Sequence, residues 1–213
     1  MSEDIGRPTV FGVRHGEVHN PDGVIYAGLA GYGLSDLGRR QALGVADALR
    51  GADVVGLYSS PLDRAIQTAG ALADALSLEI RPDDRLYEWK HWQQWAGMTW
   101  DELRTTGRDA WEAYQRDPGS VTSGESLAEL ADRVESWLIE VRAEHERGLV
   151  VAVTHLEPLR AILLRTLGRP SIDLFDIQIG LGHAVRLSPA PDANALDPQR
   201  LRAAVSGAAS GFG

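Results

Sequence analysis

Residues 10–17 read Val10-Phe11-Gly12-Val13-Arg14-His15-Gly16-Glu17, a short apolar run followed at once by an arginine and a histidine. An apolar run of this length is typical of a buried strand. In open α/β sheets, ligands bind beyond the carboxyl ends of the strands, where Arg14 and His15 would lie. A guanidinium can bind two phosphate oxygens at once, and an imidazole can attack or donate a proton. This stretch therefore predicts an anion site at the end of the first strand.

Two further apolar runs end in the same kinds of residue. The run at 54–58 is followed by Ser59-Ser60-Pro61-Leu62-Asp63-Arg64, and the run at 149–153 is followed by Thr154 and His155. If these strands are parallel, the two arginines and two histidines meet at one edge of the sheet. A helix that begins near Glu157 would add backbone N–H donors at the same place. The three strand ends together predict a pocket for a phosphate-like anion.

The rest of the chain alternates between strand and helix patterns. The first strand is expected to span 9–13, and a further short strand is expected at 78–80. Helices are expected at 35–50, 61–76, 123–148 and 159–167. Residues 175–179 and 184–187 are expected to pair as a terminal hairpin through 180–182. Residues 83–118 are irregular and aromatic, with five of the six tryptophans. The alternation predicts an α/β three-layer sandwich, in which a mixed, mostly parallel sheet has helices on both faces.

Composition limits the possible classes of protein. The chain has 213 residues, 44% of them hydrophobic, which is enough for one domain with a full core. It has no cysteine, which excludes disulfides, thiolate metal sites and a cysteine nucleophile. A net charge of −9 disfavours nucleic acid and anionic membranes as partners. No apolar stretch is long enough for a membrane span, and Met1-Ser2-Glu3-Asp4 lacks a secretory pattern, so a cytoplasmic protein is expected.

The composition changes near the C-terminus. We expect one domain over residues 1–188. After Pro189 the chain is rich in Ala, Pro, Gly, Ser and Asp, which predicts a tail over 189–213 with little core material. Nothing in the sequence decides the oligomeric state, and a homodimer through the apolar hairpin is one alternative.

Six blocks in the chain resemble the motifs of the histidine phosphatase superfamily, which has the phosphoglycerate-mutase-like fold. They are VRHGE at 13–17, LSDLGRRQA at 34–42, YSSPLDRAIQTA at 58–69, RLYEW at 85–89 followed by WAG at 95–97, SGES at 123–126 and VTH at 153–155. The block at 58–69 matches the family pattern along its length. The blocks occur in the family's order over roughly residues 9–187, which is more specific than any one of them.

The resemblance implies a role for each of the converging residues. His15 would be the nucleophile that forms a phosphohistidine, while Arg14, Arg64 and His155 would hold the phosphoryl oxygens. Glu88 would be the general acid that protonates the leaving oxygen, and then the base that activates water. A carboxyl beside a phosphate dianion is expected to have a raised pKa. No metal and no cofactor would be required, and the sequence has no metal-ligand spacing.

Other positions have weaker links to the substrate. Tyr26 and Gly28 match a substrate-loop position of the family. The family's asparagine usually lies six residues after the nucleophile, but position 21 is proline here and Asn20 lies one residue early. Trp89 follows Glu88 directly, and it either packs in the core or forms the floor of a substrate pocket.

The last histidine of the family motif is usually followed by glycine, but Leu156 stands here. Its backbone N–H can still meet phosphate, although its side chain crowds the pocket. Glu157 adds a negative charge nearby. Both changes should narrow the pocket and disfavour a substrate with a second phosphate.

These features predict a metal-independent phosphomonoesterase for a small phosphorylated metabolite, of the sugar phosphate or phosphoglycerate type. A phosphoglycerate mutase is the first alternative, but such mutases need extra basic residues and a longer insertion in the middle of the chain. Between Arg85 and Pro118, the positively charged side chains are limited to Lys90 and a few arginines. The second alternative is a non-catalytic module that binds a phosphorylated ligand or a protein. Such a module would have no need for both the nucleophile and the acid.

Overall fold

The computed structural model of the protein describes residues 7–209, so the sequence reading of Met1 to Asp4 lies outside the described residues. Its strands are β1 Thr9–Arg14, β2 Val54–Ser59, β3 Ile80–Pro82, β4 Leu149–Thr154, β5 Ala184–Ser188 and β6 Asp192–Leu196. They form one sheet in the order β3-β2-β4-β1-β5-β6. The first four strands of that order are parallel, while β5 is antiparallel to β1 and β6 is antiparallel to β5. The expected mixed, mostly parallel sheet is confirmed.

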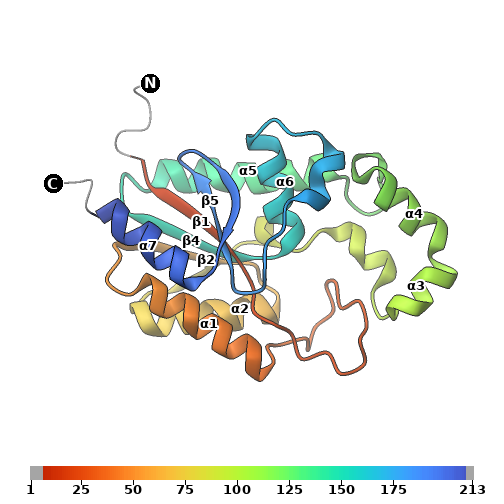
Figure 1. Ribbon diagram of the computed structural model, residues 1–213, viewed down its shortest axis with the longest axis horizontal. Helices are drawn as coiled ribbons and strands as arrows, with labels where there is room; N and C mark the ends of the chain where they lie inside the picture. Colours follow the sequence, from red (N-terminus) through yellow and green to blue (C-terminus); the bar gives the residue numbers. More distant parts are fainter. Residues whose placement is uncertain (1–6, 210–213) are drawn as a thin grey trace.

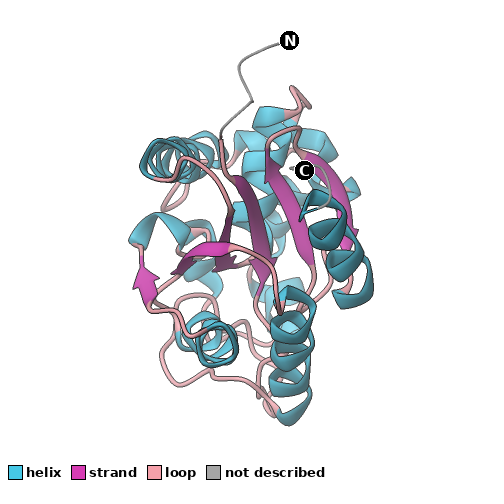
Figure 2. Cartoon of the chain, turned by 90° about the vertical axis from the view of Figure 1, so that its left-hand side faces the viewer, coloured by secondary structure: helices cyan, strands magenta, loops and turns pink. Residues whose placement is uncertain are grey.

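Helices cover both faces of this sheet. They are α1 Asp36–Leu49, α2 Asp63–Leu76, α3 Trp100–Thr106, α4 Arg108–Arg116, α5 Leu127–Glu144, α6 Leu156–Thr166 and α7 Pro198–Ala209. Helices α5 and α6 lie on one side of the sheet, and α1, α2 and α7 lie on the other (Figure 1). The turned view shows the strands running between the two groups of helices (Figure 2). No helix of the described residues is long and apolar enough to cross a membrane.

The two faces of the sheet build two separate cores because successive side chains of a strand point to opposite faces. In β4, Val150 and Ala152 pack with the apolar residues of α5 and α6. Their neighbours Val151 and Val153 pack with those of α1, α2 and α7. All residues of β4 are buried, as expected for the central strand of a sheet covered on both faces.

The expected terminal hairpin is wrong. Residues Ser171–Asp176 form a 3-10 helix, and β5 pairs with β1 and β6 instead of with residues 175–179. The apolar residues Ile177 and Ile179 are buried in the core without being in a strand. The backbone of this segment bonds to the end of β1: Gly182 N–H donates to the Arg14 carbonyl at 3.1 Å. Burial therefore explains the apolar run, which periodicity alone cannot assign to a strand.

The expected tail with little core material is also wrong. Residues after Pro189 form β6 at the edge of the sheet and α7 against α1. Leu201 and Val205 of α7 are buried with the residues of α1 and α2. A helix rich in alanine can pack closely against its neighbours, so two large buried side chains suffice to hold α7. Composition alone therefore does not show that this segment belongs to the core.

Leu201→Ala is expected to destabilise the protein by about 2–5 kcal/mol, because the side chain is 1% exposed and its removal leaves a cavity. Urea unfolding followed by circular dichroism would measure the loss. The exposed Ala203→Ser on the same helix is the control, with an expected change within about 0.5 kcal/mol. Equal, small effects of the two changes would mean that α7 contributes nothing to the core.

Candidate active site

The parallel pairing of β1 and β4 brings two of the predicted strand ends together. Arg14 lies opposite Thr154 in the register of the two strands, and the next residue, His15, donates its backbone N–H to the Thr154 carbonyl at 3.0 Å. The rings of His15 and His155 are consequently 5.1 Å apart between centroids. The convergence expected for Arg14, His15 and His155 is therefore found.

His15 is held in one orientation and in its neutral form. Its Nδ1 lies 2.8 Å from the Gly16 carbonyl oxygen, which can only accept a hydrogen bond, so the ring proton belongs on Nδ1 and Nε2 keeps its lone pair. Burial, and next the positive charge of Arg64, hold the pKa of His15 well below its usual value. A neutral imidazole with a free Nε2 is the form that can attack phosphorus.

Thr68 of α2 links the His15 loop to Arg64. Its hydroxyl accepts a hydrogen bond from Gly16 N–H at 3.1 Å and donates to the Arg64 carbonyl at 2.7 Å. Gly16 itself lies so close to the backbone of Gly38 that a Cβ would come within 2.5 Å of the Gly38 oxygen. The loop after His15 thus requires glycine for packing.

The two arginines of the cluster are anchored differently. Arg14 donates from Nη1 to the Ile179 carbonyl at 2.7 Å. Arg64 is completely buried, donates from Nη2 to the Ala27 carbonyl at 2.7 Å, and lies 4.8 Å above the ring of Tyr26. Burial lowers the pKa of both guanidinium groups from the usual value for arginine, although an arginine stays charged in proteins. Both are therefore available as cations beside His15.

His155 is completely buried at the N-terminus of α6. Its Nε2 lies 2.7 Å from the Ser60 hydroxyl, which fixes the ring. Its Nδ1 has no hydrogen-bond partner and lies 3.9 Å from Oε2 of Glu88. Burial, and then the charge of Arg64, keep the pKa of His155 well below normal. His155 therefore lies close to both Glu88 and His15, with its Nδ1 on the side of Glu88.

Glu88 has the properties of a proton donor near neutral pH. Its side chain is 13% exposed, and Oε1 accepts from Trp89 N–H at 2.9 Å. Burial raises the pKa of Glu88 to about 7, opposed by the positive charge of Arg64 and assisted by the negative charge of Glu157. The preceding segment is fixed to β4, because the Thr154 hydroxyl donates to the Leu86 carbonyl at 2.6 Å.

Glu157 brings a second buried carboxyl to this region. Its Oε1 accepts from Nη1 of Arg160 at 3.2 Å and, weakly, from the Tyr114 hydroxyl at 3.4 Å. Its Oε2 is buried without a partner. Burial raises the pKa of this carboxyl as well. Sequence reasoning placed its charge close to the pocket, and the structure locates it on the first turn of α6.

Three residues of the loop at 20–34 were predicted to lie near the substrate. In the structure, Tyr26 contacts Arg64 of the cluster, and Gly28 contacts Tyr87. Tyr26 stacks on Tyr32 and contacts the Arg64 guanidinium. Gly28 accepts a hydrogen bond from the Tyr87 hydroxyl at 3.2 Å. Asn20 is not brought to the cluster, since both polar atoms of its amide bond to the backbone of Val24 in its own loop.

The remaining two predicted residues differ in their surroundings. Leu156 is the first residue of α6, so its backbone N–H belongs to the free donors of a helix N-terminus. Trp89 is completely buried in the core beside Tyr114, and its indole N–H donates to the Glu125 carbonyl at 2.9 Å. These contacts favour the packing role of Trp89 over contact with a substrate.

Three hydroxyl residues that hold the cluster were not assigned a role from the sequence: Ser60, Thr68 and Thr154. All three are buried; Ser60 and Thr154 directly follow or end a strand, while Thr68 lies further on, within α2. A hydroxyl directly after a buried strand is a usable signal, but helix capping predicts the same residue types. The partner of each hydroxyl depends on contacts distant in sequence, such as the 95 residues between His155 and Ser60.

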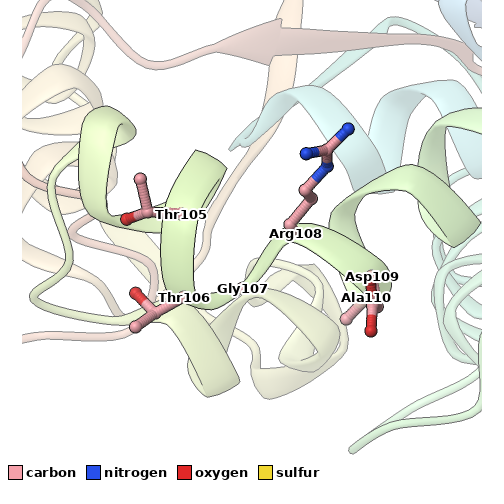
Figure 3. A pocket seen from close by; sticks show the side chains of 6 residues that line it. All are labelled: Thr105, Thr106, Gly107, Arg108, Asp109 and Ala110. Carbon is pink, nitrogen blue, oxygen red and sulfur yellow. The ribbon is translucent and has the colours of Figure 1, made fainter.

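The cluster is shielded from solvent, with His15 2% exposed and both Arg64 and His155 at 0%. A shallow hollow elsewhere, at the junction of α3 and α4, is lined by Thr105, Thr106, Gly107, Arg108, Asp109 and Ala110 (Figure 3). It contains none of the predicted site residues. Within residues 7–209, no group of three or more His, Asp or Glu side chains is arranged to hold a metal ion.

Comparison with known proteins identifies the family and similar folds. The model of the histidine phosphatase superfamily (branch 1) matches residues 10–199. Phosphoserine phosphatase 1 of Hydrogenobacter thermophilus is 38% identical over 73% of this chain and 74% of its own length. Glucosyl-3-phosphoglycerate phosphatase of Mycolicibacterium vanbaalenii is 33% identical over 81% and 79%. A solved mycobacterial glucosyl-3-phosphoglycerate phosphatase superposes with a TM-score of 0.74 and 26% identity, covering 84% of this chain and 89% of that one.

Proposed function

This chain belongs to the histidine phosphatase superfamily (branch 1), and we propose that it hydrolyses the monoester of a small phosphorylated metabolite through a phosphohistidine on His15. The observation that carries the proposal is the buried cluster in which a neutral His15 lies beside Arg64, His155 and Glu88, whose pKa is raised to about 7. Its relatives named as phosphatases support the same reaction class.

In the first step, Nε2 of His15 attacks phosphorus. The N–P bond forms as the bond from phosphorus to the ester oxygen breaks, and the leaving oxygen takes the proton of Glu88. Arg14 and Arg64 neutralise the charge on the phosphoryl oxygens, and His155, whose Nδ1 is free, lies beside the acid.

In the second step, the Glu88 carboxylate takes a proton from water as the water oxygen attacks phosphorus. The N–P bond breaks, phosphate leaves, and His15 regains its lone pair on Nε2. The Gly16 carbonyl holds the proton on Nδ1 throughout, so the ring needs no rotation between the two steps. Both protonation states of Glu88 are needed in turn, which suits a pKa of about 7.

The substrate we propose is a monophosphate of the sugar phosphate or phosphoglycerate type, or phosphoserine. The names of the relatives point to glucosyl-3-phosphoglycerate and phosphoserine. Leu156 and the unpaired oxygen of Glu157 on the first turn of α6 disfavour a second phosphate there, which is an argument against a mutase reaction. Segment 83–118 adds little free positive charge, because Arg85, Arg104 and Arg108 are paired with carboxylates.

A panel of phosphate esters tests this proposal. We expect phosphate release from phosphoserine, glucosyl-3-phosphoglycerate, sugar monophosphates or phosphoglycerates to continue in the presence of a chelator. Release would be measured by a phosphate assay, alongside a separate assay for conversion between 2- and 3-phosphoglycerate. Mutase turnover without phosphate release would contradict the proposal, and so would binding of the panel without any turnover.

The rate should fall at alkaline pH because the acid of the first step loses its proton. With a pKa of about 7 for Glu88, the protonated fraction decreases about tenfold per pH unit above that value. His15 is already neutral there because its pKa is lowered. We therefore expect kcat/KM for an alkyl phosphate to decline above about pH 7, measured with enzyme that is stable over the range. A profile that rises from pH 7 to 9 would exclude Glu88 as the acid.

A further inference from the structure

The guanidinium of Arg133, on α5, bonds to three backbone carbonyls of the segment that carries Glu88. Its Nη1 donates to the carbonyl oxygens of Arg85 at 2.7 Å and Tyr87 at 2.8 Å. Its Nη2 donates to the carbonyl oxygen of Glu88 itself at 3.1 Å. One side chain thus fixes two peptide groups before the proposed acid and the one that follows it.

Glu125, just before α5, completes the arrangement. Its two carboxylate oxygens accept from Nε of Arg133 at 2.6 Å and from Nη2 at 3.0 Å. The same carboxylate accepts from Lys90 N–H at 3.2 Å, and the Glu125 carbonyl accepts from the Trp89 indole. The backbone on the C-terminal side of Glu88 is therefore fixed to the same pair.

Every N–H of Arg133 has an acceptor in this arrangement. A guanidinium has five N–H groups in a rigid planar fork, and the five contacts above use all of them. The side chains of Arg133 and Glu125 are only 15% and 8% exposed. Lysine has three donors on a flexible stem, so it would keep the charge but lose the geometry.

We propose that Arg133, paired with Glu125, is a positioning residue that holds the peptide groups around Glu88 so that its carboxyl faces His155. Neither residue touches the reacting atoms. The inference rests on the proposed function, in which Glu88 is the general acid. Because a shift of about 1 Å in a catalytic group can cost about 100-fold in rate, a loosened backbone here would impair proton transfer specifically.

Two substrates with different leaving groups distinguish a positioning role of Arg133 from a general structural one. An alkyl phosphate such as phosphoserine needs a proton on its leaving oxygen, whereas p-nitrophenyl phosphate releases a stable anion and needs little assistance. The comparison uses kcat/KM, which covers the steps up to loss of the leaving group and leaves out the second step that both substrates share. For Arg133→Lys we expect kcat/KM to fall by about 100-fold on the alkyl phosphate and by less than about threefold on the aryl phosphate. Arg165→Lys is the matched control, since Arg165 of α6 also bonds to α5, through Asp132 and Glu135, and should leave both rates unchanged.

A double variant tests whether Arg133 acts through Glu88. Glu88→Gln should itself be impaired on the alkyl phosphate, and adding Arg133→Lys should cost nothing more, because the acid is already absent. Multiplied losses in the double variant, or equal losses on the two substrates, would overturn the positioning role. Impairment by Glu88→Gln without impairment by Arg133→Lys would overturn the positioning role alone. Unimpaired Glu88→Gln would overturn the proposed acid and the positioning role with it.

Glu125→Gln is a second route to the same answer if Arg133→Lys fails to fold in thermal unfolding. The amide keeps the size of the side chain and one acceptor oxygen, but removes the charge that orients Arg133. The same selective loss on the alkyl phosphate is expected, at about tenfold. A folded Glu125→Gln protein with no selective loss would contradict the proposal.

Discussion

His15→Ala is expected to lower kcat for phosphate ester hydrolysis by at least about 10,000-fold. The proposed chemistry passes through a bond from Nε2 of His15 to phosphorus, and alanine offers no atom that could form it. The other imidazole, His155, is held by Ser60 with its ring centroid 5.1 Å from that of His15, so it does not occupy the position of the missing nitrogen. The arginines would still bind phosphate, so binding should survive the loss of turnover.

Two measurements check this result. Rapid quenching of the wild-type enzyme with a ³²P-labelled substrate should trap an acid-labile phosphoryl group on the protein, and the variant should trap none. Inorganic phosphate binding and the thermal unfolding midpoint serve as controls for the fold of the variant. Turnover that persists in His15→Ala would show that another residue is the nucleophile.

Arg64→Lys is expected to lower kcat/KM by about 1,000-fold, a size typical of a transition-state arginine. Arg64 is completely buried next to His15, so its charge acts where water cannot screen it. A lysine keeps one positive charge, yet it cannot reach two phosphoryl oxygens at once or keep the planar contact with the Tyr26 ring.

Steady-state kinetics on the best substrate of the panel would measure this effect. Arg169→Lys is the control, because Arg169 is a partly exposed arginine paired with Asp173 and Asp176. It should change kcat/KM by less than about twofold. A similarly small change in Arg64→Lys would mean that a point charge suffices and that the fork plays no part.

The converging strand ends could be predicted from the sequence because a short physical rule governs them. Apolar runs of strand length mark buried strands, and parallel strands carry whatever follows them to the same edge of the sheet. This rule alone predicts that Arg14, His15 and His155 lie together. The pairing of β1 with β4 then sets which residues lie opposite one another. The resemblance to a known family contributed Glu88, which does not directly follow a strand because a 3-10 helix at Asp84–Leu86 separates it from β3.

The remainder depends on contacts that no local pattern encodes. Arg133 lies 45 residues from Glu88, and it reaches the three backbone carbonyls of the acid segment only when α5 packs against that segment. The amide of Asn20 is taken up by its own loop, which residue type alone does not reveal. Ile177 and Ile179 gave a strand-like pattern, but they are apolar because they are buried in the core and not because they pair in a strand.

The carbonyl of Ala27, in the loop at 20–34, fixes the guanidinium that we expect to bind phosphate. It accepts from Nη2 of Arg64, and Ala27 adopts a φ of +36°, a left-handed conformation that costs free energy for alanine. A guanidinium has five N–H groups and the Ala27 carbonyl accepts from one of them, so a phosphoryl group can bind others while the loop holds the fork in place. Substitutions far from the phosphate, in the loop at 20–34, can therefore tighten or weaken its binding without contacting it.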